Sequence, residues 1–212
     1  MQPVPRLIRA VLWDLDGVLI DSFEVWFHLL NATSRAFGGI EISRKAMRDG
    51  WGQGIAADVE RWFPHKTVAE TEAHYHAHFM EHATHLRVDP DARAVTAELR
   101  RRGTAQALIT NTPAPLAREI LGHALLELDD VVGGTDVPNA KPAPDMVREA
   151  CRRLGVTASE AIVVGDSRYD LEAARGAGVH CIGLRMDADA RIERVGDLLD
   201  LPELPGSAAS LR

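Results

Sequence analysis

A regular alternation of short apolar runs and helical patterns constrains the fold of this chain more than any other feature. The runs are short and rich in Val and Ile, which favours strands. The helical segments between them open on Pro or Asp and stop near Gly. Strands joined through helices predict an α/β fold, a doubly wound, Rossmann-like parallel sheet with helices on both faces. The expected strands are a run from Ile8 to Leu15, Gln106–Thr110, Asp130–Val132, Ala161–Val164 and Val179–Leu184, and the expected helices are Asp91–Arg102, Pro115–Gly122, Pro144–Gly155 and Asp170–Gly176.

The alternation is interrupted between about residues 22 and 88, where we find helical patterns and no convincing strand. A helical block inserted after the first strand is expected over the carboxyl end of that strand, where ligands bind in open α/β sheets. We therefore predict a catalytic core of residues 1–20 and 89–212, and an all-helical cap domain of residues 21–88. The expected cap helices are Ser22–Phe37, Ser43–Arg48, Ile55–Phe63 and Thr67–Leu86, and the tail is expected to form one more helix, Ala190–Leu199.

Composition narrows the possible partners and locations. The chain has 212 residues, 46% of them hydrophobic, and a net charge of −7, which disfavours nucleic acid or an anionic membrane as the main partner. Its two cysteines lack metal-type spacing, so a reducing compartment is expected. No segment approaches a membrane span, and the N-terminus lacks a signal-peptide core. We predict a cytoplasmic protein, monomeric or homodimeric, that acts on a small molecule.

The first apolar run ends in two carboxylates. Asp14 and Asp16 alternate with apolar residues, so both side chains point to the same side of the strand. Their mutual repulsion and burial cost several kcal/mol unless a cation lies nearby. The alternative is a polar strand end that runs into a turn at Gly17.

Polar residues also follow the other expected strands. They are Thr110 and Asn111, then Lys141, then Asp166 and Asp170. Because the carboxyl ends of parallel strands meet at one edge, a single crevice can collect them. Several acids with one lysine indicate a divalent cation together with a phosphoryl group. The lysine, the hydroxyl and backbone N–H groups near Gly17 and Asn111 can hold phosphate oxygens.

Four segments of the chain, DLDGVLIDS, LITNT, AKPAPD and GDSRYD, resemble in order the four motifs of the haloacid dehalogenase superfamily of hydrolases. The resemblance covers residues 8–20 and 89–184, and an inserted helical cap also fits that family. It implies that Asp14 is the nucleophile that forms an aspartyl-phosphate. Asp16 would protonate the leaving oxygen and later deprotonate the hydrolytic water. Thr110 and Lys141 would neutralise the transferring phosphoryl group.

The same resemblance implies a Mg²⁺ site. The expected ligands are the Asp14 carboxylate, the Asp16 backbone carbonyl and the Asp166 carboxylate, with Asp170 as a further ligand or an anchor. In this family the second acid separates phosphatases from true dehalogenases, so Asp16 favours phosphate chemistry. Related sugar phosphomutases carry a histidine early in the first cap helix, where this chain has Trp26, with His28 two residues later. A mutase is therefore the weaker alternative, beside a broad small-molecule phosphatase.

One cap segment, GWGQGIAADVER, is similar to the tryptophan- and glycine-containing segment of phosphoglycolate phosphatases. A helix that begins after Gly52 and Gly54 would offer free N–H groups to a substrate carboxylate, with Arg48 or Arg61 nearby. This favours 2-phosphoglycolate as substrate, and the alternative is an ordinary turn between two helices. A dinucleotide-binding loop is disfavoured because no strand precedes these glycines.

Two further patterns have simple interpretations. Ser22 is expected to be a helix N-cap. His74, His78, His82 and His85 recur at helical spacing and could bind a metal, although a solvated face is the favoured interpretation.

A non-enzymatic phospho-receiver module is the alternative from another functional class. Such modules are shorter, carry adjacent acids after the first strand and lack an inserted cap.

Overall fold

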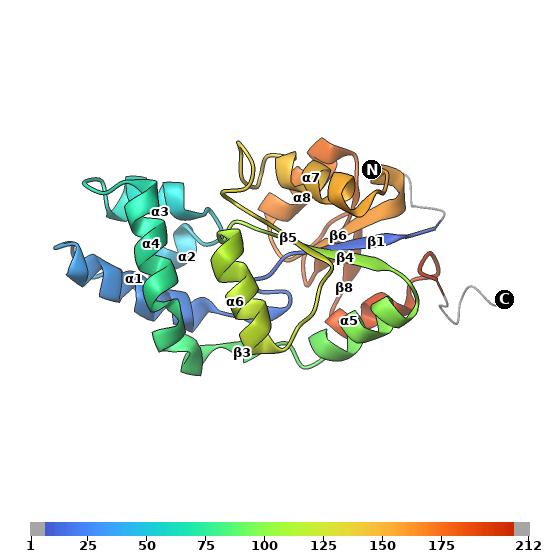
Figure 1. Ribbon diagram of the computed structural model, residues 1–212, viewed down its shortest axis with the longest axis horizontal. Coiled ribbons are helices and arrows are strands. Elements are labelled where there is room, and N and C mark those ends of the chain that lie inside the picture. Colours follow the sequence, from blue (N-terminus) through green and yellow to red (C-terminus); the bar gives the residue numbers. More distant parts are fainter. Residues whose placement is uncertain (1–6, 206–212) are drawn as a thin grey trace.

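The computed structural model describes residues 7–205 (Figure 1). At its centre is a six-stranded sheet with the strand order β5-β4-β1-β6-β7-β8, in which every neighbouring pair is parallel. This confirms the predicted doubly wound α/β class. The strands are β1 (Ala10–Trp13), β4 (Ala105–Thr110), β5 (Asp130–Gly133), β6 (Ala161–Gly165), β7 (His180–Leu184) and β8 (Ala190–Ile192).

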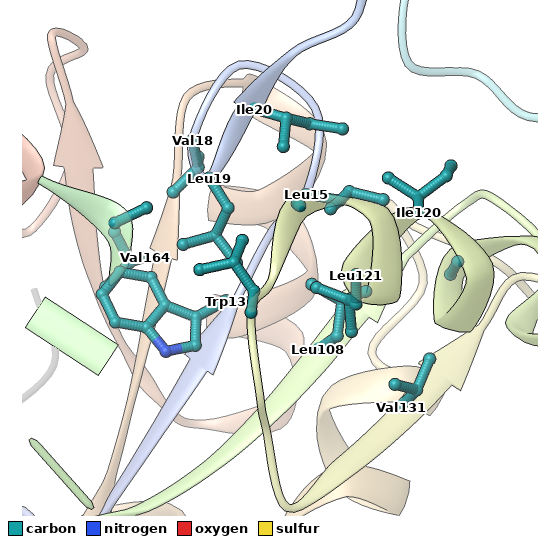
Figure 2. Close-up of a cluster of buried hydrophobic side chains, with 14 of the residues drawn as sticks. Trp13, Leu15, Val18, Leu19, Ile20, Leu108, Ile120, Leu121, Val131 and Val164 are labelled. Atoms are coloured by element: carbon teal, nitrogen blue, oxygen red, sulfur yellow. The ribbon is translucent and has the colours of Figure 1, made fainter. Parts of the chain in front are cut away.

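Helices cover both faces of this sheet because alternate strand residues are apolar on both sides. Ala10 and Leu12 of β1 face a cluster formed with α7 (Asp145–Leu154) and α8 (Arg168–Ala177). Val11 and Trp13 face the opposite cluster, formed with α5 (Ala92–Arg101) and α6 (Ala114–Ala124). Figure 2 shows the second cluster around Trp13. The indole of Trp13 is fully buried and donates to the Gln106 side chain at 3.1 Å.

Residues 23–85 form a separate group of helices, here called the helical block, which lies to the left of the sheet in Figure 1. Its interior is aromatic: the Trp26 ring meets the rings of Tyr75 and Phe79 edge-on, at 5.4 and 5.0 Å. Thr67 and Glu70 form a capping box at the start of one helix. The block contains α1 (Phe23–Ala36), α2 (Arg44–Asp49), α3 (Ile55–Trp62), α4 (Val68–His78) and the 3₁₀ helix η1 (Phe79–His85).

Two details of the inserted region differ from the sequence prediction. The expected helix Thr67–Leu86 ends at His78 and continues as the 3₁₀ helix η1. The region of residues 21–88 was also expected to lack strands, yet β2 (Ile20–Asp21) and β3 (Arg87–Val88) pair antiparallel. This short pair joins the helical block to the rest of the chain. β2 crosses the expected boundary at residues 20/21 and β3 ends at the one at 88/89, and the division into two domains stays a prediction.

The predicted tail helix Ala190–Leu199 is wrong. Ala190–Ile192 forms β8, which pairs with β7, and Val195–Asp200 forms a 3₁₀ helix, η3. The buried residues Ile192, Val195 and Leu198 have a spacing that also suits an α-helix, so the pattern was ambiguous. The open edge of β7 decided the outcome by offering a strand partner. No helix within residues 7–205 is long and apolar enough to cross a bilayer.

Candidate active site

The carboxyl ends of β1, β4 and β6 bring the predicted polar residues together. The Asp14 N–H donates to the Val164 carbonyl at 2.9 Å, so Asp14 continues the β1–β6 ladder. The chain then turns tightly. The Gly17 N–H donates to the Ile20 carbonyl at 2.7 Å, and Gly17 has a φ of +86° that favours glycine. The alternative, in which Asp14 and Asp16 only mark a polar strand end, is therefore incomplete, because the acids at the ends of these strands lie close together.

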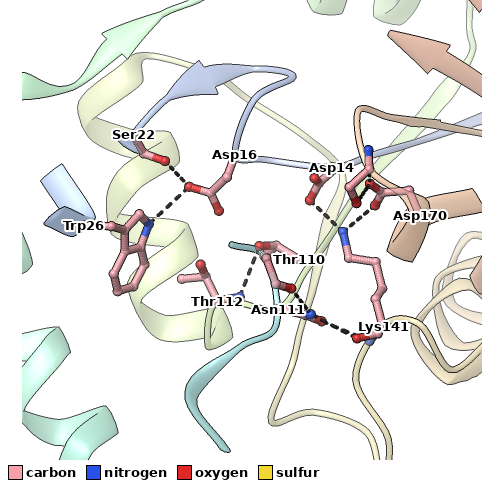
Figure 3. A network of polar contacts seen from close by, with 11 residues as sticks. Asp14, Asp16, Ser22, Trp26, Thr110, Asn111, Thr112, Lys141 and Asp170 are labelled. Atoms are coloured by element: carbon pink, nitrogen blue, oxygen red, sulfur yellow. Dashed lines mark hydrogen bonds and ion pairs between the residues drawn. The ribbon is translucent and has the colours of Figure 1, made fainter. Parts of the chain in front are cut away.

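Lys141 lies between two of these carboxylates (Figure 3). Its Nζ donates to Asp14 Oδ1 and to Asp170 Oδ1, each at 2.6 Å. All three residues are buried. Burial raises the pKa of Asp14 well above its ordinary value, and the Asp170 charge adds to this effect while Lys141 opposes it. Burial alone would lower the pKa of Lys141, but the two carboxylates outweigh it and raise that pKa. The lysine is therefore a fixed positive charge beside Asp14.

Asp166 completes the acidic cluster at the end of β6. A side chain at Gly17 would place its Cβ 1.9 Å from Asp166 Oδ2, so only glycine fits there. Burial, followed by repulsion from Asp170, raises the pKa of Asp166 to about 6. The backbone of the turn therefore lies in direct contact with the Asp166 carboxylate.

The donor set of the cluster fits a hard divalent cation. Asp14, Asp166 and Asp170 each offer a carboxylate oxygen, and these oxygens lie within 4.8 Å of one another. A cation there would relieve the repulsion that raises the pKa values of Asp14 and Asp166. Among residues 7–205, this is the one group of three or more acidic, histidine or cysteine side chains with such spacing. The Asp16 side chain lies outside it.

Asp16 is held apart from the other acids by the start of α1. Its Oδ1 accepts hydrogen bonds from the Ser22 hydroxyl and from Trp26 Nε1, the latter at 3.2 Å (Figure 3). Burial raises the pKa of Asp16, while these hydrogen bonds and one from Thr112 oppose the rise. Ser22 occupies the N-cap position, but its side chain makes no capping hydrogen bond. Ser22 therefore takes the predicted N-cap position, but its hydroxyl donates to Asp16 instead of accepting an N–H of the helix.

Trp26 is the site residue that the sequence analysis missed. In the sequence, Trp26 stood out only because related mutases have a histidine at this place. In the structure its indole N–H donates a hydrogen bond to Asp16. A signal was present in the sequence: Trp26 follows Ser22 by four residues, so both lie on one face of the helix that leaves the DLDGV motif.

Thr110 and Asn111 end β4 beside the cluster. Thr110 is buried, and its Oγ1 accepts the Thr112 N–H at 3.1 Å. The Asn111 amide contacts the backbone of Lys141 twice, accepting its N–H at 2.9 Å and donating to its carbonyl at 3.1 Å. It also donates to the Gly52 carbonyl at 2.7 Å. Asn111 therefore positions Lys141 and ties the helical block to the sheet.

The glycine loop before α3 reaches residues beside the acidic cluster, and of the two expected arginines Arg61 lines one of the cavities described below whereas Arg48 does not. Gly52 lies against the Tyr169 ring and Gly54 against the Asn111 side chain, each 3.4 Å from where a Cβ would stand. Arg48 is exposed and stacks on the Phe23 ring at 5.2 Å, and it lines neither of the cavities described below. The expected contact of Arg48 with the substrate is therefore not supported.

Two cavities open at this point. The smaller, about 330 Å³ including space open to solvent, is lined by polar groups and is here called the acidic cavity. The larger, about 670 Å³ on the same measure, lies between the helical block and the residues that follow β1 and β4, and is here called the block cavity. They share Asp16, Trp51, Gly52 and Asn111 in their lining, so they adjoin. The acidic cavity is lined by Asp14, Asp16, Trp51, Gly52, Thr110, Asn111, Lys141, Asp166, Ser167 and Tyr169.

The histidine stripe does not assemble into one site. His74 and His78 meet at 4.4 Å between ring centroids in α4, whereas His85 stacks on His28 of α1 at 4.3 Å. The change from α-helix to 3₁₀ helix after His78 breaks the shared face. Within the described residues, no group of three histidines has ligand atoms close enough for a metal ion.

Known proteins place this chain among phosphate-handling hydrolases. Residues 11–184 match the family described as haloacid dehalogenase-like hydrolase. A phosphoglycolate phosphatase from Yersinia pestis is 34% identical over 194 residues, covering 84% of this chain and 82% of that protein. A phosphoglycolate phosphatase from Pseudomonas putida is 31% identical, covering 95% and 80%.

Solved structures agree with these sequence matches. CbbY from Rhodobacter sphaeroides, crystallised with phosphate, is 26% identical with a TM-score of 0.81, covering 97% of this chain and 99% of that one. A CbbY mutant bound to xylulose-1,5-bisphosphate gives a TM-score of 0.80 with the same coverage. These matches support a phosphatase and exclude the phospho-receiver alternative. The chain belongs to the haloacid dehalogenase-like hydrolases.

Proposed function

We propose that this protein is a Mg²⁺-dependent phosphomonoesterase that acts through an aspartyl-phosphate at Asp14. The observation that carries the proposal is the contact of Lys141 Nζ with Asp14 and Asp170, at 2.6 Å each, beside Asp166. A phosphoryl group brings negative charge to this point. A buried lysine and a bound cation are the groups that neutralise such charge.

In the first step a carboxylate oxygen of Asp14 attacks phosphorus, and the bond from phosphorus to the leaving oxygen breaks. Lys141 and the Thr110 hydroxyl lie beside the transferring group and stabilise its charge. Asp14, Asp166 and Asp170 would hold Mg²⁺, with the Asp16 carbonyl as a further candidate ligand. The cation would supply charge neutralisation and help orient the phosphate.

Asp16 moves the protons. It protonates the leaving alcohol in the first step and removes a proton from water in the second, when water attacks the aspartyl-phosphate. Burial and hydrogen bonds from Ser22 and Trp26 hold this carboxyl away from the acidic cluster. Separation of the two acids explains how one can attack while its neighbour exchanges protons.

The decisive experiment is transfer of ³²P from a labelled phosphomonoester to the protein in rapid-quench samples. The wild type should form an acid-stable, hydroxylamine-sensitive phosphoenzyme, and Asp14→Asn should form none. Asp21→Asn is the matched control, because Asp21 is exposed and lies seven residues along the same segment. A labelled Asp14→Asn protein would mean that the nucleophile is a different residue.

At a finer level, 2-phosphoglycolate is one candidate substrate, supported by the names of several relatives and by the loop from Gly50 to Gly54 at the acidic cavity, while the lining of the block cavity supports a second candidate class described below. A mutase is not favoured, because the Trp26 indole occupies the space beside Asp16. We also propose a cytoplasmic location and a monomer or homodimer. A panel of small phosphorylated metabolites with Mg²⁺ tests the substrate directly.

A further inference from the structure

Each of the two cavities suits a different part of a phosphomonoester. The acidic cavity holds Lys141 and the three clustered carboxylates, so it suits the phosphate and its cation. The block cavity shares Asp16 and Asn111 with it. Asp16 is the proposed proton donor to the leaving oxygen. The alcohol part of the substrate must therefore extend past Asp16 into the block cavity.

The wall of the block cavity is largely aromatic and aliphatic. Trp26 contacts Asp16 through its N–H and Tyr75 through its ring, and the Tyr75 hydroxyl donates to Asp58 at 3.0 Å. These contacts form one continuous wall from Asp16 to Asp58. The remaining apolar lining is supplied by Leu30, Met47, Trp51, Ile55, Ala57 and Trp62.

This lining suits an apolar group better than a carboxylate. A buried carboxylate needs a cation or several N–H donors, whereas most of this lining is aromatic or aliphatic. Among the described residues that form this lining, Arg61 supplies the one cationic side chain, and Arg61 is exposed. A two-carbon glycolate would also contact few of these apolar side chains.

We propose that the block cavity selects phosphomonoesters whose alcohol carries an uncharged aromatic group, stacked among Trp26, Trp51 and Trp62, in preference to anionic alcohols such as glycolate. This inference rests on the proposed phosphomonoesterase function, because it assumes that phosphate occupies the acidic cavity. Burial of an aromatic ring among these side chains gains apolar area, and ring-to-ring contact adds to it.

The test compares kcat/KM for three phosphomonoesters in the presence of Mg²⁺: ethyl phosphate, 2-phenylethyl phosphate and 2-phosphoglycolate. Ethanol and 2-phenylethanol are leaving groups of similar acidity, so the comparison isolates binding of the ring. We expect 2-phenylethyl phosphate to exceed each of the other two by about tenfold or more.

A cavity-filling variant locates the effect. Ala57 lines the block cavity, and Ala57→Leu should reduce the ratio of kcat/KM for the phenylethyl ester to that for ethyl phosphate to about twofold. Ala56→Leu is the matched control, because Ala56 is its exposed neighbour on α3 and lines neither cavity. It should keep the full preference.

The wild-type comparison needs no variant, so a poorly folded Ala57→Leu protein does not remove the test. Turnover of ethyl phosphate with no gain for the phenylethyl ester, or a preference for 2-phosphoglycolate, overturns this inference alone. Equal loss of preference in Ala56→Leu and Ala57→Leu also overturns it. Failure to hydrolyse any of the three esters overturns the proposed function, and this inference with it.

Discussion

At the scale of single residues, the site depends on how differently two neighbouring aspartates are surrounded. Asp14 is held by Lys141 among other acids, whereas Asp16 is turned toward Ser22 and Trp26 on α1. Two carboxylates in unlike environments can take unlike roles, one as nucleophile and one as proton carrier. The contacts of Asp16 come from the helical block, so its role depends on a region outside the sheet.

Substitution of Trp26 by Phe tests this dependence. The variant keeps a ring against Tyr75 and Phe79 but loses the N–H that holds Asp16. We expect kcat to fall by about tenfold, with the phosphoenzyme still formed and the denaturation midpoint changed little. Steady-state kinetics and chemical denaturation measure both. An unchanged kcat would show that the hydrogen bond has no part in positioning the acid.

Asp58 gives a prediction for stability. Burial raises its pKa from 3.8 to about 7 in the folded protein. Between these values the folded state binds more protons than the unfolded state, so this group lowers stability as pH rises from about 4 to about 7. Asp58→Asn removes that contribution. The free energy of unfolding of the variant relative to wild type should therefore rise between pH 5 and pH 8, by on the order of 2 kcal/mol. Urea titrations of both proteins at pH 5 and pH 8, with chelator present, measure the two free energies of unfolding. The same difference between variant and wild type at both pH values would contradict the prediction.

At the scale of elements, the tight turn after β1 shapes the acidic cluster. Gly17 combines a left-handed backbone with close contact to Asp166. Gly17→Ala should lower kcat/KM by about a hundredfold or more, because its Cβ would displace the Asp166 carboxylate.

Gly38→Ala separates this effect from backbone strain. Gly38 has a φ of +74°, but an added Cβ there meets nothing within 4 Å. Both variants should lose about 1 kcal/mol of stability, while only Gly17→Ala should lose activity. Activity and thermal melting measured together decide between the two effects. Similar activities for the two variants would show that contact with Asp166 is unimportant.

At the scale of the whole molecule, the helical block and the sheet meet at the site. The β2–β3 pair, the Asn111–Gly52 hydrogen bond and the Gln53–Tyr169 hydrogen bond, at 3.1 Å, connect them. The block therefore closes over the carboxyl ends of the strands, which supports the proposed role of a cap.

Bound Mg²⁺ should stabilise the whole chain. It would neutralise repulsion among Asp14, Asp166 and Asp170, so millimolar Mg²⁺ should raise Tm by several degrees, and EDTA should reverse the shift. Asp166→Asn should reduce this shift, whereas NaCl of equal ionic strength should not reproduce it. Differential scanning calorimetry measures Tm for each protein and condition. Equal shifts in wild type and Asp166→Asn would place the cation elsewhere.

Much of the fold could be predicted because its signals are local. Short Val- and Ile-rich runs with Pro, Asp and Gly at the helix ends indicated the β1, β4, β5, β6 and β7 strands. The predictions failed where the partner is distant in sequence: β2 needs β3, and β8 needs the free edge of β7. β2 and β3 have two residues each, which is too short for an alternating pattern to be detected in the sequence.

The sheet class, the order of the motifs and the acids that follow the strands could be predicted from the sequence, because alternation and spacing are properties of the chain. The folded structure was needed to show that Ser22 and Trp26 hold Asp16, that Arg48 lies outside the site, and that the block cavity is aromatic. Those contacts join β1 to helices whose relative positions depend on packing. The four-residue spacing of Ser22 and Trp26 places both on one face of α1, but only packing decides that this face meets a carboxylate from the sheet.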